Sequence, residues 1–253
     1  GEGPHSISTK SNDEKLVEVV QSRKAAVDFI EQVVGINGID CDFKRVPWSL
    51  FSVEGQSRSF VQKEREAALR AGLPVISEVP YHITVDEGFT IPDQAQFNPL
   101  KYVVGLASTI NSDTCRIFEN TRVVNVEEGD VCTVETENGR VRASKVIMAT
   151  HTPKGIYMVH TSLGPYREYA VAATLKGGYP PPGIFWDMQE SEHHSIRTYE
   201  SEEGPIVMVL GEMHKVGQKE DNLKCYHNLE NFLRKRFDVD SIVYRWSAQQ
   251  YKA

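Results

Sequence analysis

The 253-residue sequence is poor in cysteine and has no long run of apolar or basic residues. The four cysteines show no CxxC or CxH spacing, which argues against a zinc or iron–sulfur site and suits thiols in a reducing compartment; they are Cys41, Cys115, Cys132 and Cys225. No apolar run approaches the roughly 18–20 residues that cross a bilayer. We therefore expect a cytoplasmic protein with no membrane span and no metal site.

The charge balance is mildly acidic, with a formal net charge of −7 at pH 7. An acidic balance without a long basic run argues against a nucleic-acid-binding surface. Apolar residues make up 40% and charged residues 25% of the sequence, which is typical of a soluble globular protein. The N-terminal segment lacks the basic and apolar regions of a secretory signal. Because G-x-S-x-G, HExxH and P-loop spacings are absent too, the hydrolase and kinase classes have no support.

Apolar residues spaced at nearly 3.6 positions predict a helix over residues 13–34. Ser11 or Asn12 would cap this helix, and Gly35 is expected to end it. Two further helices are predicted over residues 57–71 and 222–237, the second with an apolar stripe along one side.

Asn98 followed by Pro99 is typical of a helix start, since Asn can cap the helix and Pro suits its first position. The helix over 100–110 is apolar on most sides, so we expect it to be buried. Strands are predicted from apolar runs between Gly and Pro turns over residues 167–175, 183–187, 195–199, 205–210 and 242–246.

Residues 122–153 predict three short antiparallel strands with acidic, Gly-containing turns, EEGD and ENGR, followed by an apolar strand. That last strand, KVIMAT, leads into a small-residue turn at Ala149 and Thr150. A buried strand that ends in small residues lets a flat ligand lie against the backbone. The whole order of elements indicates a mixed α/β (α+β) chain whose halves share sheets.

Five segments, in this order, resemble the glycine/D-amino-acid oxidase superfamily of FAD-dependent oxidoreductases, in the branch often fused to a Rieske domain. They are QAQFNPLKY (94–102), KVIMATHTP (145–153), HSIRTY (194–199), GEMHKVGQ (211–218) and YRWSAQ (244–249). The resemblance implies a partial FAD-domain meander and an antiparallel substrate-domain sheet with flanking helices. It implies these divisions: 1–96, a helical part of the substrate domain; 97–153, part of the FAD-binding domain; 154–210, the substrate-binding sheet; 211–253, a return helix and strand.

The sequence departs from the family pattern at both ends. Its nearest approach to the dinucleotide-binding G-x-G-x-x-G is GEGPHS at residues 1–6, where no strand precedes and Pro4 is not expected to open a helix. Asn98 stands where the family has His, and Met213 interrupts a Glu-Asp-His run. We therefore expect a fragment that lacks the N-terminal Rossmann unit and the C-terminal flavin loop. Exposed apolar surface around Ile147 and Met148, with self-association into a homo-oligomer, is predicted to follow.

For the parent protein, the resemblance implies FAD as cofactor and oxidation of a C–N bond in an amine or amino acid, with hydride transfer to the flavin. For this chain, which lacks the glycine fingerprint, we expect FAD to be absent or weakly bound and the fragment to be inactive. An iron–sulfur protein is the implied electron-transfer partner. The residues implied in holding the cofactor are Val123, on the strand near the adenosine, and Ala149, Thr150 and His151, in the turn by the pyrophosphate. Gln96, before the helix over 100–110, is placed at the mouth of the site.

Two side chains are the candidates for catalysis. Arg197 is predicted to clamp a substrate carboxylate, because a guanidinium group offers a planar pair of donors; a structural ion pair is the alternative. His214 is expected in a glycine-bounded loop between a strand and a helix, where it suits proton handling; a structural hydrogen bond is the alternative. The neighbours His193 and His194 would point to opposite faces of a strand, so they are not expected to bind one metal.

Tyr166 and Tyr169 are weaker candidates for a substrate pocket, and Trp246 is expected in the core. A second function from a different class stays open. The chain would then be a non-catalytic binding or interaction module that keeps the substrate-domain scaffold and does not hold flavin.

Overall fold

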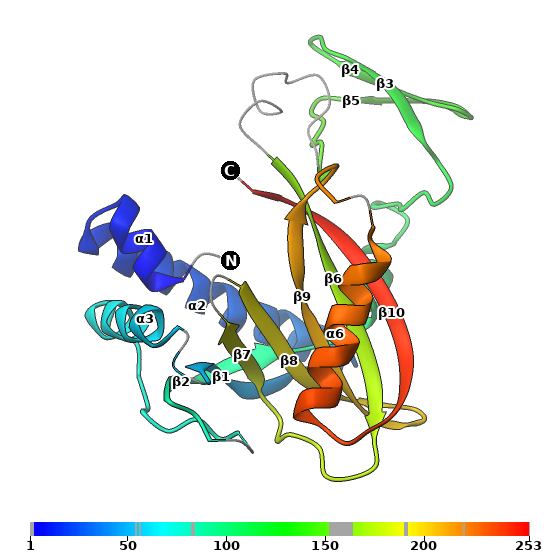
Figure 1. The fold of residues 1–253 in the computed structure, drawn as a ribbon. Helices are drawn as coiled ribbons and strands as arrows, with labels where there is room; N and C mark the ends of the chain where they lie inside the picture. The colour runs from blue at the N-terminus through cyan, green and yellow to red at the C-terminus, as the bar shows by residue number, and fades with distance from the viewer. Residues whose placement is uncertain are drawn as a thin grey trace.

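The computed structural model describes residues 3–53, 55, 57–81, 84–151, 164–189, 192–219 and 221–252. The fold is mixed α/β, with one large and one small sheet (Figure 1). The large sheet consists of β1 (Lys44–Ser52), β2 (Glu87–Gln96), β6 (Gly164–Leu175), β7 (Ile184–Gln189), β8 (Glu192–Ser201), β9 (Gly204–Lys215) and β10 (Val239–Lys252). All five strands predicted in the C-terminal half are present in it.

The seven strands of the large sheet follow the order β10-β6-β9-β8-β7-β1-β2. Neighbours pair antiparallel except β1 and β7, which run parallel with Trp48 opposite Ile184. This pairing joins β1 and its antiparallel neighbour β2 to β7, a strand that follows much later in the chain. The division expected between residues 210 and 211 falls inside strand β9, which contains both residues.

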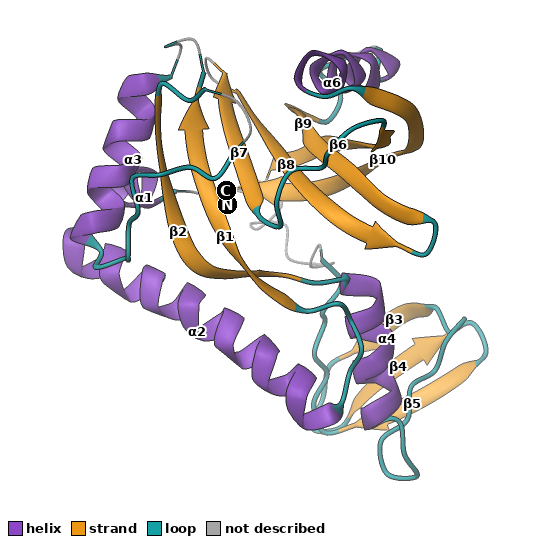
Figure 2. Cartoon of the chain, turned by 90° about the horizontal axis from the view of Figure 1, so that it is seen from below, coloured by secondary structure: helices purple, strands orange, loops and turns teal. Residues whose placement is uncertain are grey.

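Helices flank the large sheet at its two ends (Figure 2). They are α1 (Pro4–Lys10), α2 (Asp13–Asn37), α3 (Arg58–Arg70), α4 (Pro99–Ile110) and α6 (Leu223–Arg236). In Figure 2, α1, α2 and α3 lie beside β1 and β2, whereas α6 lies over the end formed by β6, β9 and β10. The predictions of α2, α3, α4 and α6 are therefore confirmed.

Two predictions at the N-terminal end were wrong. Pro4 does open a helix, because its fixed φ and missing N–H suit the first helical position of α1. Asn12 caps α2 as predicted, with its Oδ1 accepting from Lys15 N at 2.9 Å, but α2 runs through Gly35. It ends at Gly38, whose φ of 61° is the left-handed conformation that terminates helices. A glycine inside a helix costs only about 1 kcal/mol, so Gly35 alone does not stop it.

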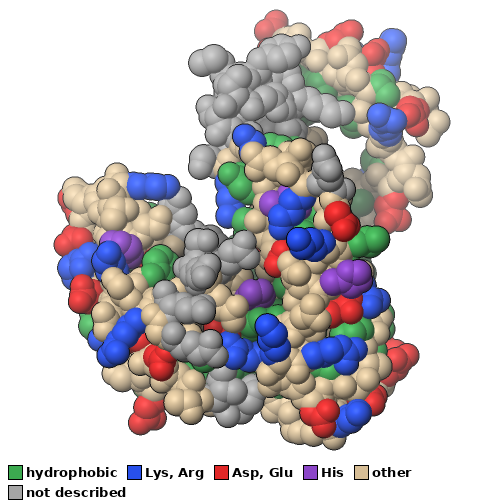
Figure 3. Space-filling model, in the orientation of Figure 1, with side chains coloured by type: hydrophobic (Ala, Val, Ile, Leu, Met, Phe, Trp, Pro, Cys, Tyr) green, Lys and Arg blue, Asp and Glu red, His purple; other side chains and the backbone are tan. Residues whose placement is uncertain are grey.

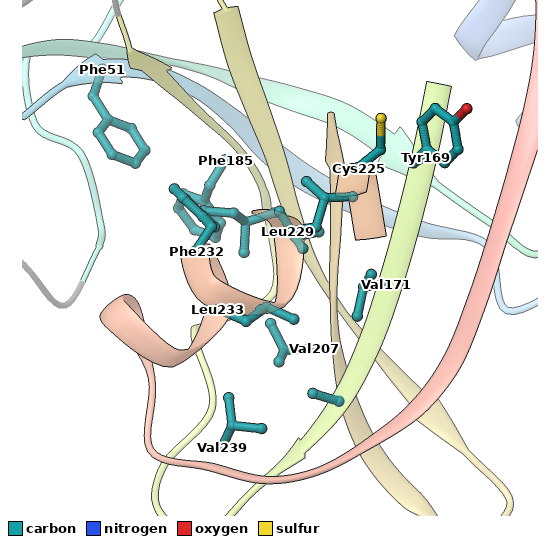
Figure 4. Packing of buried hydrophobic residues seen from close by; sticks show 13 residues of the cluster. Phe51, Tyr169, Val171, Phe185, Val207, Cys225, Leu229, Phe232, Leu233 and Val239 are labelled. Atoms are coloured by element: carbon teal, nitrogen blue, oxygen red, sulfur yellow. The ribbon is translucent and has the colours of Figure 1, made fainter. Parts of the chain in front are cut away.

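The main core lies between α6 and one face of the large sheet (Figure 4). Fully buried apolar side chains of five strands meet Leu229 and Leu233 of α6 there; those of the strands include Phe51, Tyr169, Val171, Phe185, Ile196, Val207 and Val209. Arg236 at the end of α6 also reaches this face, and its Nη2 lies 2.8 Å from Oδ2 of the fully buried Asp187. A smaller core on the opposite face packs α3 against β1 and β2, through Val61, Ala68, Leu50 and Phe89.

The small sheet contains three antiparallel strands, as predicted: β3 (Val123–Glu127), β4 (Cys132–Thr136) and β5 (Gly139–Ala143), in the order β3-β4-β5. The apolar strand expected over 145–150 is wrong, because no strand occurs in those described residues. Ile147 is 92% exposed and has no sheet to join. Exposed apolar surface at this place is thus confirmed, while self-association stays a prediction. The end of the predicted meander at Thr152 and Pro153 lies outside the described residues.

Helix α4 starts as predicted, with Asn98 Oδ1 accepting from the backbone N–H groups of Leu100 and Lys101, each at 3.1 Å. Its expected burial is wrong: Leu100 is 72% and Val103 59% exposed. On one side of the helix, Gly105 lies close against Ile39 beyond α2. An apolar composition therefore predicted a buried helix, but the packing leaves Leu100 and Val103 exposed.

Among the described residues, no helix combines the length and apolarity that crossing a membrane requires. All four cysteines are free thiols. Cys41 and Cys225 are buried, as expected of structural thiols, whereas Cys115 is exposed.

Candidate functional site

The face of the large sheet opposite α6 carries the candidate site. Ile196 on β8 packs into the α6 core, and successive strand residues point to opposite faces, so Ser195 and Arg197 lie on the other side. Paired residues of neighbouring strands share a face, which places Ile184 and Trp48 in one cross-sheet row with Arg197. We call the side defined by Trp48, Trp186, Ser195 and Arg197 the Arg197 face.

Arg197 is half-buried on this face. Its Nε and Nη2 both donate to Ser195 Oγ at 3.4 Å. No carboxylate among the described residues lies within 4.0 Å of it. Burial lowers the pKa of Arg197, and the negative charge of Glu168 opposes that shift. A guanidinium group has five N–H donors, so Arg197 has donors left for an anionic ligand.

Glu168 on β6 was not selected from the sequence. It lies on the Arg197 face, because its neighbour Tyr169 belongs to the α6 core. Burial raises the pKa of its carboxyl group, and the positive charges of Lys252 and Arg197 act in the opposite direction. Glu168 lines a polar cavity of about 230 Å³ together with Tyr166, His193, Met213 and Lys252. The sequence did offer one signal for this residue: Glu168 directly precedes the mostly apolar run YAVAATL of the same strand.

The pair His193 and His194 points to opposite faces, as the sequence predicted. The His193 ring stacks on Trp186 on the Arg197 face, with centroids 4.5 Å apart, whereas the His194 ring stacks on Phe232 of α6 at 4.1 Å. Burial lowers the pKa of each imidazole to about 4. Both rings are therefore neutral at physiological pH.

The low pKa of His194 predicts acid sensitivity of the fold. Below about pH 6.5 the unfolded chain takes up a proton that the folded chain accepts only near pH 4, so this part of the stability is present above pH 6.5 and lost on acidification to pH 4. The loss amounts to about 3 kcal/mol for this histidine. Replacement His194→Phe keeps a ring on Phe232 and removes the proton site. Urea unfolding at pH 7 and pH 4 should show a smaller acid loss in this variant.

The matched control for that experiment is His227→Gln, since His227 is exposed on α6. It should leave the acid loss unchanged. An unaltered acid loss in His194→Phe would contradict the assignment to His194.

His214 does not lie in a loop, so that expectation was wrong. Strand β9 continues to Lys215, because pairing with β6 resumes after an irregularity at residues 212 and 213, with Arg167 opposite His214. His214 Nε2 lies 3.0 Å from the Tyr169 hydroxyl, which also donates to Asn222 Oδ1 at 2.7 Å. Tyr169 belongs to the α6 core. The structure thus places the two candidate catalytic residues, Arg197 and His214, on opposite faces of the sheet.

The other candidate residues are also divided between the faces. Tyr166 lines the cavity beside Glu168, while Tyr169 points into the α6 core. The expectation that Trp246 is a core aromatic was wrong, because it is 40% exposed on β10. Strand β10 is an edge strand of the large sheet, so along one edge it pairs with no other strand in the described structure.

The residues predicted to hold a cofactor lie in three places. Val123 is 46% exposed on β3, an outer strand of the small sheet. Ala149, Thr150 and His151 are exposed; His151 has a positive φ of 61° and places its ring 5.1 Å from that of Tyr251 on β10. Gln96 ends β2, and its Nε2 donates to Thr198 O on β8 at 3.3 Å.

Part of this set fits a flat dinucleotide. Gln96 Oε1 is buried without a hydrogen-bond partner in the described structure, which leaves an acceptor for a ligand donor. The exposed Ile147 and Val123 offer apolar surface for a ring system. The printed sequence contains no strand–GxGxxG–helix unit, so the pyrophosphate cradle of such a ligand is not among these residues.

The surface charges bear on the class of partner. On the face shown in Figure 3, the described Lys and Arg side chains are interspersed with Asp and Glu side chains. A nucleic-acid-binding protein gathers basic side chains into a patch or stripe. No such patch is seen among the described residues of the face in Figure 3.

Comparison with known proteins agrees with this arrangement. A family model described as FAD dependent oxidoreductase matches residues 5–249. The protein named Rieske 2Fe-2S iron-sulfur protein YhfW, from Bacillus subtilis (strain 168), is 25% identical over 236 residues. The match covers 90% of this chain and 46% of that protein. The chain thus spans about half the length of this relative.

Two solved structures share the fold. Glycine oxidase from Geobacillus kaustophilus has a TM-score of 0.70 at 14% identity and covers 92% of this chain and 66% of its own. L-proline dehydrogenase from P. horikoshii has a TM-score of 0.66 at 16% identity and covers 90% of this chain and 65% of its own. At these identities the likeness concerns the fold alone.

Proposed function

The chain belongs to the FAD dependent oxidoreductase family, and from this premise we propose that it serves an enzyme that oxidises the C–N bond of an amino acid. The observation that carries the proposal is the half-buried Arg197, whose hydrogen bonds go only to Ser195 Oγ within the described structure. A planar guanidinium group with free donors matches a substrate carboxylate. The names of the two structural neighbours, glycine oxidase and L-proline dehydrogenase, support an amino-acid substrate.

The Arg197 face can also recognise the amino group. Glu168 lies within electrostatic reach of Arg197, so the face presents one cationic and one anionic side chain to a zwitterion. Because burial raises its pKa, the Glu168 carboxyl group is suited to accept a proton from the substrate ammonium. Deprotonation makes the nitrogen lone pair available and thereby prepares the neighbouring C–H bond for oxidation.

FAD, when bound, supplies the redox chemistry as the acceptor of the hydride. Val123, Ala149, Thr150, His151 and Gln96 are the residues of this chain proposed to contact it. His214 is left out of the proposal, because it lies on the α6 side and bonds Tyr169. The name of the Rieske relative supports an iron–sulfur protein as electron acceptor, and the free cysteines suit a cytoplasmic location.

The visible absorption spectrum of the purified protein, with and without added FAD, tests the proposal. If the chain holds flavin, the two bands of the oxidised flavin survive desalting and bleach when an amino acid is added without oxygen. N-Acetylated amino acids, which lack a basic nitrogen, are the matched control and should not bleach the bands. A protein that stays colourless after incubation with FAD would contradict flavin binding and favour the non-catalytic binding module.

A further inference from the structure

A cross-sheet row connects Arg197 with an aromatic wall. Trp48 on β1 pairs with Ile184 on β7, and Ile184 pairs with Arg197 on β8, so the three side chains share the Arg197 face. Since neighbouring strands lie ~4.8 Å apart, Trp48 is about 10 Å from Arg197 along this row. In the adjacent row, Trp186 pairs with Ser195, the residue that bonds the Arg197 guanidinium. Arg197 does not itself line the cavity of the tryptophans, so a ligand that contacts Arg197 and the tryptophans must extend from Arg197 along this row.

The tryptophans form one wall of a cavity. Its volume is about 290 Å³, close to the lower end of the range for small-molecule sites. Ile91, Leu73 and Pro92 line the cavity with the two indole rings, and Gln94 lies at its polar side. Arg23, Lys24 and Asp93 complete its polar side. The remaining lining is apolar and large enough for a ring, whereas a substrate without a side chain would leave it unfilled.

Packing holds the two indole rings in defined orientations. Trp48 and Trp186 meet edge to face with centroids 5.4 Å apart. Trp48 also meets Phe89 edge to face at 5.8 Å, and the His193 ring stacks on Trp186. Edge-to-face and offset-stacked arrangements are the preferred geometries of aromatic pairs. The wall is therefore pre-formed, so that an aromatic ligand loses little free energy in ordering it.

One polar atom of the wall lacks a partner. Trp186 Nε1 is buried and makes no hydrogen bond in the described structure. An indole N–H is a donor only, and leaving a buried donor unpaired costs roughly 1–3 kcal/mol. An acceptor on the ligand would recover this cost.

From this geometry we infer that the substrate is an α-amino acid with an aromatic side chain that carries a hydrogen-bond acceptor, as tyrosine does. Its carboxylate binds Arg197, its ring lies against Trp48 and Trp186, and its acceptor meets Trp186 Nε1. The inference rests on the proposed function, because it assigns the side chain of a ligand whose carboxylate Arg197 holds.

Isothermal titration calorimetry of the FAD-supplemented protein with tyrosine, phenylalanine and glycine tests the inference. We expect tyrosine to bind at least tenfold more tightly than glycine. Trp48→Ala should weaken tyrosine binding about tenfold and change glycine binding less than twofold. Trp186→Phe keeps a ring but removes the donor, so it should abolish the preference for tyrosine over phenylalanine. Trp246→Phe on β10 is the matched control and should change none of these affinities.

The possible failures of the two proposals differ. Equal affinities for glycine and tyrosine, unchanged by Trp48→Ala, would overturn the aromatic assignment and leave the carboxylate site intact. Binding of no amino acid at all would overturn both. Circular dichroism of each variant checks that the fold is retained, and Trp186→Phe, the mildest change, keeps the test decisive if Trp48→Ala does not fold.

Discussion

Replacing Arg197 with glutamine is expected to weaken amino-acid binding about 100-fold, measured by calorimetry on the FAD-supplemented protein. The reason is the loss of one partner of a desolvated ion pair, which costs roughly 3 kcal/mol. The glutamine side chain keeps hydrogen-bond donors at moderate length but carries no charge. The fold should be retained, because within the described residues the guanidinium bonds only to Ser195 Oγ, at the long distance of 3.4 Å.

Two further variants separate charge from geometry at this position. Arg197→Lys keeps the charge without the planar pair of donors, so an intermediate loss is expected. Arg167→Gln is the matched control: Arg167 lies on β6 but donates to Ser247 Oγ at 2.8 Å on the α6 side of the sheet. Its replacement should leave binding unchanged. Wild-type affinity in Arg197→Gln would refute the carboxylate clamp.

The largest effect on stability is expected from Arg236→Met, which should lower the free energy of unfolding by about 3–5 kcal/mol. Asp187 is fully buried, and Arg236 is its charged partner at 2.8 Å. Removal of the guanidinium leaves a buried carboxylate without that compensation. Urea unfolding at pH 7 measures the change, with the slope of the transition as a check that the unfolding remains two-state.

Arg245→Met is the matched control, since Arg245 pairs with Glu230 at 2.6 Å but its side chain is 50% exposed. Exposed pairs contribute at most about 1 kcal/mol. The double variant Asp187→Leu, Arg236→Met removes both charges and should recover much of the loss. If Arg236→Met costs no more than Arg245→Met, the buried pair does not stabilise the fold as argued.

Local signals in the sequence predicted most elements of the fold. Asn98 and Pro99 marked the start of α4 because a cap and a fixed φ act within a few residues. The turns EEGD and ENGR correctly divided the three strands of the small sheet. The helix end predicted at Gly35 was wrong, because a glycine is tolerated inside a helix. The helix ends at Gly38, which adopts a positive φ.

Predictions that depended on burial were less reliable. The apolar α4 looked buried in sequence, yet it exposes Leu100 and Val103. Trp246 likewise looked like a core residue and lies on the outermost strand. The hydrophobicity of a side chain indicates that its burial would be favourable, but it does not indicate which helix or strand will cover it.

The sequence by itself determined the family, the order of helices and strands, and the alternation that sets His193 and His194 on opposite sides of β8. Only the tertiary structure decided which side of the sheet α6 covers. That choice separated Arg197 from His214, selected Glu168, and aligned Trp48 with Arg197 through the parallel pairing of β1 and β7. The physical reason is that alternation along a strand is a local property, whereas the pairing of strands distant in sequence depends on the packing of the whole chain.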